Sequence, residues 1–251
     1  MDHIGEFFPD SPIWFRWLGR LAAPLFFYAL AVGFQHTRNR KKYLLRLYLA
    51  NVGMVFFNQI MCMLQRKLDY VAYQPKNHNI FTTLFCAGVL ICIWENRKEK
   101  KKFFTYIGIY IFWQAMVMGL AILAEAFDYV WRGNALLQTV LRTNYIFPLL
   151  GGIWDAEGGV FFIVLGIWLY CAVENKWKLA LRYILFCGAY MFMCQGDILY
   201  RIMSRFSFWG YHKLADVIYF GSSFVGIPLG TSDLSLLTEF YQWMMIGALP
   251  I

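Results

Sequence analysis

The sequence predicts an all-α, polytopic integral membrane helix bundle with about seven to nine transmembrane or re-entrant helices. Of the 251 residues, 60% are hydrophobic and only 15% are charged, whereas soluble domains are about half apolar and about a quarter charged. The apolar residues form runs of about 20, the length that crosses a bilayer. The net charge of +8 comes from short basic clusters between these runs, which is typical of cytoplasmic membrane loops. With no nucleic-acid motif beside them, these clusters exclude nucleic acid as a predicted partner and leave the lipid bilayer.

The first predicted span runs over residues 13–34 and is the most informative part of the chain. It contains Arg16, Arg20 and Pro24. An arginine inside a bilayer span is costly and indicates a functional site by default. Arg16 and Arg20 are one helical turn apart and therefore lie on the same helix face. Arg20 is the stronger candidate, because Arg16 lies near the outer interface, where its side chain can reach water.

Later parts of the chain continue the alternation of apolar runs and polar breaks. Segments 135–153 and 213–230 are apolar but contain several Pro and Gly residues, so we predict re-entrant or interfacial placement, with surrounding protein burying the backbone. No repeat or linker divides the chain, which predicts a single domain over residues 1–251. The remaining predicted spans are 43–63, 79–94, 103–124, 159–174, 178–196 and 236–251.

Three basic clusters predict the orientation of the spans. They lie at residues 38–42, 97–102 and 176–182, after the first, third and fifth spans. Simple alternation places all three on one side, which the positive-inside rule assigns to the cytoplasm. We therefore expect the outward-facing parts to be the N-terminus and residues 64–78, 125–158 and 197–235.

Short motifs in and around the first span identify a family resemblance. They are Asp2-His3-Ile4-Gly5, GRLAAPLF at 19–26, Gly33-Phe34, His36-Thr37 and YLLRL at 43–47, with weaker echoes at 79–82 and 155–159. This pattern resembles the TraX family of bacterial membrane proteins, specifically over residues 2–47 and loosely beyond. Against the family pattern the chain looks cut at both ends, so we expect one helix before Asp2 and another after Ile251.

The resemblance implies an enzyme of the bacterial cytoplasmic membrane. TraX is named for acetylating the N-terminus of a conjugative pilin, and the family looks related to multi-pass acyltransferases that use acetyl-CoA. The implied function is transfer of acetyl from acetyl-CoA to an amine or hydroxyl, on a protein or glycan acceptor near the outer face. Two other functions stay open: a transporter or channel with an anion path lined by Arg20 and Arg46, and a non-catalytic membrane assembly component.

A histidine near the N-terminus is the candidate general base. Acetyl transfer needs a group that takes the proton of the acceptor, and imidazole is suited to this role near neutral pH. His3 is the candidate, with Asp2 as the carboxylate beside it. Adjacent helix side chains do not face each other, so Asp2 would orient His3 only from a loop or through other partners. The alternative is a polar N-terminus at the interface with no chemical role.

Arginines are the candidate ligands of the donor. Guanidinium groups bind phosphate bidentately, and coenzyme A carries a pyrophosphate and a 3′-phosphate. Arg20 and Arg46 are the main candidates, and their alternative role is a structural ion pair with Glu125, Asp155 or Asp197. Additional donor contacts are predicted from His36, Arg38 and Arg40, whose alternative roles are helix capping, topology and anionic-lipid contact.

No metal site is predicted. The four histidines and six cysteines form no HExxH, HxxxH or CxxC pattern, so zinc and other metals have no ligand set. The cysteines lie in or beside apolar runs and are expected to be small buried residues. His78 and His212 lie in polar segments and are expected to be solvated.

Overall fold

The computed structural model of the chain describes residues 12, 14–67, 79–132, 145–154, 156–195 and 197–225. All regular secondary structure in these residues is helical, as predicted. The predicted span 236–251, the parts 135–144 and 226–230 of the two broken segments, and His78 and Asp155 lie outside them. The chain divides into two compact units, which are unit 1 (1–35 and 158–251) and unit 2 (36–157).

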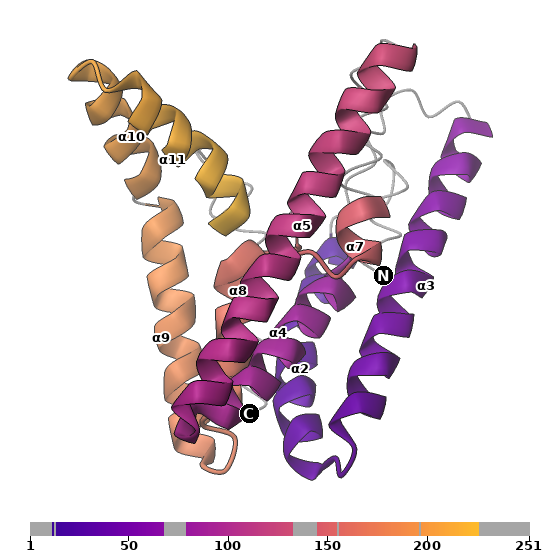
Figure 1. Cartoon of the computed structure of the whole chain (residues 1–251). Helices are drawn as coiled ribbons and strands as arrows, with labels where there is room; N and C mark the ends of the chain where they lie inside the picture. Colours follow the sequence, from indigo (N-terminus) through magenta and orange to yellow (C-terminus); the bar gives the residue numbers. More distant parts are fainter. Residues whose placement is uncertain are drawn as a thin grey trace. The chain divides into compact units, whose positions relative to one another are not determined.

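The helices of the two units follow the predicted spans closely. Unit 1 contains α2 (Trp14–His36), α8 (Gly159–Tyr170), α9 (Lys176–Gln195), α10 (Ile198–Phe208) and α11 (His212–Val225) (Figure 1). Unit 2 contains α3 (Arg40–Lys67), α4 (Ile80–Glu95), the 3-10 turn η1 (Asn96–Lys98), α5 (Lys100–Arg132) and the single turn α7 (Phe147–Leu149). Six predicted spans are therefore helices, namely α2, α3, α4, α5, α8 and α9.

The segment after α9 differs from the prediction. Residues 197–235 were expected to be an outward-facing segment with an apolar, interfacial part at 213–230. Their described part instead forms two helices, α10 and α11, joined at Gly210, which has a φ of 81°. In α10 the polar residues Arg201, Ser204 and Arg205 interrupt the apolar residues. The segment therefore has no apolar run long enough to predict a span, although it is helical.

Three helices in the described part of the chain are long and apolar enough to cross a membrane. Their spans are Arg40–Met61, Ile80–Lys98 and Lys100–Ala124, and Gly159–Tyr170 is a shorter apolar helix. Only 11% and 17% of the apolar windows of α3 and α5 are buried inside the protein. Large side chains on these helices, such as Phe56 and Phe112, are 61% and 72% exposed. Because so much contiguous apolar surface is not tolerated in water, we infer that these helices face lipid.

Asparagine side chains cap the N-termini of three of the helices. The Oδ1 atom of Asn39 accepts a hydrogen bond from the backbone N of Lys42 at 3.0 Å, and that of Asn79 accepts from Phe81 N at 3.2 Å. Asn175 Oδ1 accepts from the backbone N of residues 177 and 178, both at 3.1 Å. Such caps satisfy backbone N–H groups that have no partner in the first turn. They add a polar first turn, which explains why α3 begins at Arg40 rather than at the predicted 43.

Aromatic rings hold α2, α8 and α9 of unit 1 together. The Phe162 ring of α8 lies 5.8 Å from Phe27 of α2, and 5.8 Å and 5.6 Å from Phe186 and Tyr190 of α9, between centroids. Gly158, with a φ of 72°, precedes α8, and a Cβ atom there would lie 2.2 Å from the Phe162 ring. Only glycine fits this position, because it tolerates both the backbone angle and the close ring.

In unit 2 an irregular segment lies buried among the long helices. The turn α7 packs against α3 and α5 (Figure 1), and Phe147, Pro148, Gly151 and Gly152 are buried. Gly151 has a φ of 64°, and a Cβ atom there would lie 2.7 Å from the Phe85 ring. Non-helical backbone at membrane depth requires protein partners for its polar groups. The burial of this backbone by protein agrees with that part of the prediction for residues 135–153, and re-entrant or interfacial placement in the membrane stays a prediction.

Side chains of α3 and α5 supply these partners. Four consecutive carbonyl oxygens accept side-chain hydrogen bonds from these helices: Pro148 from Asn51 Nδ2 (2.6 Å), Leu149 from Tyr48 Oη (2.8 Å), Leu150 from Trp113 Nε1 (2.9 Å) and Gly151 from Gln114 Nε2 (3.1 Å). The Gly151 oxygen also accepts from the Cys86 thiol of α4 at 3.5 Å. Gln114 also accepts from Ile153 N at 2.9 Å. The polar residues of the long helices are therefore used to hold the irregular segment.

A second layer of hydrogen bonds supports Asn51. Its Oδ1 atom accepts from Asn79 Nδ2 at 2.7 Å and from Thr82 Oγ1 at 2.8 Å, and all three side chains are at most 1% exposed. Asn79 and Thr82 belong to the weak motif echo at 79–82. In the structure this echo is a packing motif that joins α3, α4 and α7.

The orientation prediction is tested by cysteine labelling in intact cells. In a cysteine-free background, Lys101→Cys should stay unreactive toward a membrane-impermeant maleimide until the cells are permeabilised. Ser207→Cys, in the segment predicted to face outward, is the matched case and should react without permeabilisation. Both residues are exposed, so burial does not explain a difference. Labelling of Lys101→Cys in intact cells would reverse the orientation.

Candidate functional site

Three of the predicted donor ligands lie together where α2 ends and α3 begins. His36 is the last residue of α2 and is exposed. Arg38 lies in the connecting turn and is exposed, and Arg40 opens α3 and is half-buried. The five residues from His36 to Arg40 thus present an imidazole and two guanidinium groups within one short turn.

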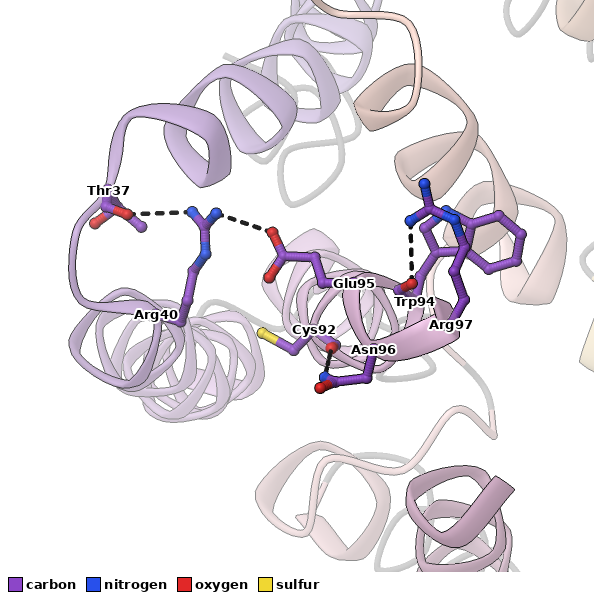
Figure 2. Close-up of polar contacts among 7 residues, drawn as sticks. All are labelled: Thr37, Arg40, Cys92, Trp94, Glu95, Asn96 and Arg97. Carbon is purple, nitrogen blue, oxygen red and sulfur yellow. Dashed lines mark hydrogen bonds and ion pairs between the residues drawn. The ribbon is translucent and has the colours of Figure 1, made fainter. Parts of the chain in front are cut away.

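Arg40 is held in place by contacts on both sides. Its Nη2 atom lies 2.9 Å from Glu95 Oε1 at the end of α4, and its Nη1 atom donates to the Thr37 carbonyl oxygen at 3.2 Å (Figure 2). The side chains of Arg40 and Glu95 are 31% and 30% exposed. Paired groups with this exposure typically contribute about 0–1 kcal/mol to stability. The ion pair therefore mainly orients the guanidinium group and joins the α2–α3 turn to the end of α4.

Basic residues surround this pair. We call residues 38–42 together with 95–102 the cationic end of unit 2; it holds nine Lys or Arg residues and two carboxylates. Lys102 lies 2.7 Å from Glu99, and the Arg97 guanidinium lies 5.1 Å from the centre of the Trp94 ring (Figure 2). Lys41, Lys42, Lys98, Lys100 and Lys101 are exposed. The Arg40–Glu95 contact places both basic clusters at one end, as alternating spans require.

Arg46 does not join this group. It is exposed on α3, six residues after Arg40, which is about 9 Å along a helix and about 120° around it. Arg20 lies on α2, sixteen residues before His36, or about 24 Å along the axis. The side chains of Arg16, Arg20 and Glu125, and all of Asp2, His3 and Asp155, lie outside the described residues.

An open pocket of about 380 Å³ begins at the cationic end. It lies among α3, α4 and α5 and runs from polar residues at the cationic end to apolar residues further along these helices. Asn96 donates from Nδ2 to the Cys92 carbonyl oxygen at 2.8 Å, and both residues line the pocket (Figure 2). The pocket is lined by Leu44, Val89, Cys92, Ile93, Asn96, Tyr106, Ile109, Tyr110 and Trp113.

Glu95 and the pocket were not predicted. In the sequence Glu95 is the polar end of the third apolar run, 55 residues from Arg40. Alternating spans place the end of the third span on the same side of the membrane as the start of the second, but they do not identify the contact. The pocket residues are apolar or aromatic side chains with ordinary spacing, which nothing in the sequence distinguishes from lipid-facing positions.

The residues that the structure describes hold no metal-ligating group of three or more His, Cys, Asp or Glu side chains. Cys86, Cys92, Cys171 and Cys187 are free thiols. His212, at the start of α11, is exposed, with its Nδ1 atom 3.5 Å from Ser207 Oγ.

In the comparison with protein families, the model described as TraX protein matches residues 1–200 of the chain. The matched region contains the α2–α3 turn, the cationic end and the pocket. Comparisons with curated proteins and with solved structures give no match.

Proposed function

Because the family model covers residues 1–200 of 251, the chain belongs to the TraX protein family, and we propose that it is an integral membrane acetyltransferase. Its donor is acetyl-CoA, and its acceptor is an amine or hydroxyl near the outer face of the bacterial cytoplasmic membrane. Family membership is the observation that carries this proposal. The lipid-facing helices and the cationic end support it, because they offer a membrane location and a site for an anionic donor.

The proposed reaction is a direct acyl transfer. The acceptor nitrogen or oxygen attacks the thioester carbonyl carbon, so that a C–N or C–O bond forms and the C–S bond breaks. The base removes the acceptor proton, and the coenzyme A thiolate leaves and takes a proton. His3 is the proposed base, with Asp2 beside it.

The donor phosphates are proposed to bind at the α2–α3 turn. His36, Arg38 and Arg40 lie within five residues there, and Glu95 fixes the direction of the Arg40 guanidinium. Arg20 and Arg46 remain proposed donor ligands, but their places along α2 and α3 differ from that of this turn. If they bind the donor, they contact a different part of one extended molecule.

Arginine variants test this donor site through acetyl-CoA binding to the purified protein. A hydrogen bond to a charged group contributes about 1.5–3 kcal/mol, or about 10–150-fold in affinity. Arg38→Ala and Arg40→Ala should each weaken binding within this range. Arg→Lys should restore only part of the loss, since ammonium lacks the bidentate geometry. Arg205→Ala is the matched control, because Arg205 is an exposed arginine of α10 far from the turn in sequence, and it should leave the affinity unchanged.

The Arg40 result is separated from ion-pair loss by Glu95→Gln. This change breaks the ion pair but keeps the guanidinium, so it should leave donor affinity within a few-fold of the wild type. If Glu95→Gln weakens binding as much as Arg40→Ala, the arginine acts only through the pair. Unchanged affinity in folded Arg20, Arg38, Arg40 and Arg46 variants would contradict the donor site and favour a non-catalytic assembly component.

A further inference from the structure

We propose that the pocket among α3, α4 and α5 binds one acyl chain of an anionic phospholipid, with the lipid phosphate at the lysines of the cationic end. Three observations carry this inference: the shape of the pocket, the order of polar and apolar residues along it, and the excess of positive charge at its mouth. The inference concerns lipid binding and does not depend on acetyl transfer.

The pocket is elongated along the helices. Its lining runs from Asn96 at the start of η1 to Val89 on α4, and from Tyr106 to Trp113 on α5. Seven residues of helix correspond to about 10 Å along each axis. The pocket therefore extends inward from the cationic end as a slot parallel to the helices, which is the direction of a lipid chain in a bilayer.

Polar and apolar groups are arranged along this slot as in an amphiphile. The Asn96 amide and the Tyr106 side chain lie at the cationic end, whereas Leu44, Ile93 and Ile109 line the apolar part. The Tyr110 hydroxyl is buried beside the Cys86 and Gln114 side chains. Such a lining suits hydrocarbon. The pantetheine arm of coenzyme A contains two amides, and each amide group buried without a partner costs about 1–3 kcal/mol. The apolar part of the pocket therefore favours an acyl chain over pantetheine.

The charge at the mouth selects an anionic lipid. Lys41 lies one turn from Leu44 on the same face of α3, and Lys102 lies one turn from Tyr106 on α5. Both lysines are exposed, and Lys102 is paired with Glu99 at 2.7 Å. The nine basic residues of the cationic end outnumber its two carboxylates. Each lysine or arginine near the membrane surface favours anionic lipid.

The volume of the pocket favours a single hydrocarbon chain over a helix of a second copy as the occupant. One turn of helix with side chains, about 11 Å wide and 5.4 Å long, occupies roughly 500 Å³. The pocket holds about 380 Å³, which is less than one such turn. A single hydrocarbon chain is thinner and fits the slot.

Native mass spectrometry tests the proposal. The full chain is released from micelles that contain equal amounts of phosphatidylglycerol and phosphatidylcholine with identical acyl chains, and the lipids that stay bound are identified. One phosphatidylglycerol should be retained preferentially. Ile109→Trp should lower its retention about tenfold, since it fills the slot and displaces apolar contact. Ile111→Trp is the matched control: Ile111 is 62% exposed against 60% for Ile109, lies on the same helix and does not line the pocket. This control should behave as the wild type.

The headgroup contact is tested separately. Lys41→Gln with Lys102→Gln should lower phosphatidylglycerol retention about 30-fold, toward that of phosphatidylcholine. Lys176→Gln with Lys178→Gln, two exposed lysines of α9, should have no effect. Equal retention of the two lipids, or equal effects of Ile109→Trp and Ile111→Trp, would overturn the proposal. Displacement of the lipid by glycerol phosphate would assign the pocket to a free phosphate, and displacement by acetyl-CoA would assign it to the donor. A dimer that Ile109→Trp abolishes would assign it to a second copy of the chain.

Discussion

Replacing His3 by alanine is expected to lower the turnover of acetyl transfer by about 10²–10⁴-fold, the usual contribution of a general base. The KM for acetyl-CoA should change little, because the base acts on the acceptor proton and not on the donor phosphates. His36→Ala should show the opposite pattern, a raised KM for acetyl-CoA with kcat nearly unchanged. The measurement is steady-state acetyl transfer in membranes that contain the protein, with wild-type and variant amounts matched.

Added imidazole distinguishes a lost base from a lost structural contact. It should restore part of the activity of His3→Ala, since a free base can occupy the space of the missing ring, and it should not restore His36→Ala. His212→Ala is the control, because His212 is exposed at the start of α11 and has no proposed role. A His3→Ala protein that keeps full turnover, or that fails only because it does not fold, would remove His3 from the reaction.

The helices could be predicted because lipid imposes a simple rule on the sequence. Apolar runs of sufficient length must form helices in a bilayer, and α2, α3, α4 and α9 therefore match their predicted spans within a few residues. The ends were less accurate. α5 continues to Arg132, eight residues beyond the predicted 124, because a helix can continue into polar sequence after the apolar run has ended.

The contacts between helices could not be predicted in the same way. Glu95 pairs with Arg40 across 55 residues of sequence, and Gln114 binds a turn that lies 37 and 39 residues away. A polar residue in an apolar run indicates that it has a partner but does not identify the partner. Arg46 shows the same limit, because its place in an apolar run predicted a contact with the donor or with a carboxylate, and the structure describes only its exposed position on α3.

Asn51 is the polar residue whose loss should affect unit 2 most. Its side chain donates to the Pro148 carbonyl oxygen and accepts from Asn79 and Thr82. In Asn51→Leu the Thr82 hydroxyl loses its bond to this side chain, whereas Asn79 can keep its bond to the Asn51 backbone oxygen at 3.1 Å. The Pro148 carbonyl loses one hydrogen bond but keeps the one from Gly151 N at 3.2 Å. A buried polar group left without a partner costs about 1–3 kcal/mol, and one lost hydrogen bond costs about 0.5–1.5 kcal/mol, which together predict a loss of about 1.5–4.5 kcal/mol.

The free energy of unfolding, measured by SDS titration of the purified protein, should therefore fall by about 1.5–4.5 kcal/mol in Asn51→Leu. Asn58→Leu is the matched control. Asn58 lies two turns further along α3 on the same face, and its buried Oδ1 atom has no hydrogen-bond partner among the described residues. Its replacement should be neutral or stabilising, because it removes a polar atom that already lacks a partner. Adding Thr82→Val to Asn51→Leu should cause little further loss, since the hydroxyl it removes has already lost its acceptor. If Asn51→Leu and Asn58→Leu destabilise the protein equally, the network around α7 does not hold the irregular segment in place.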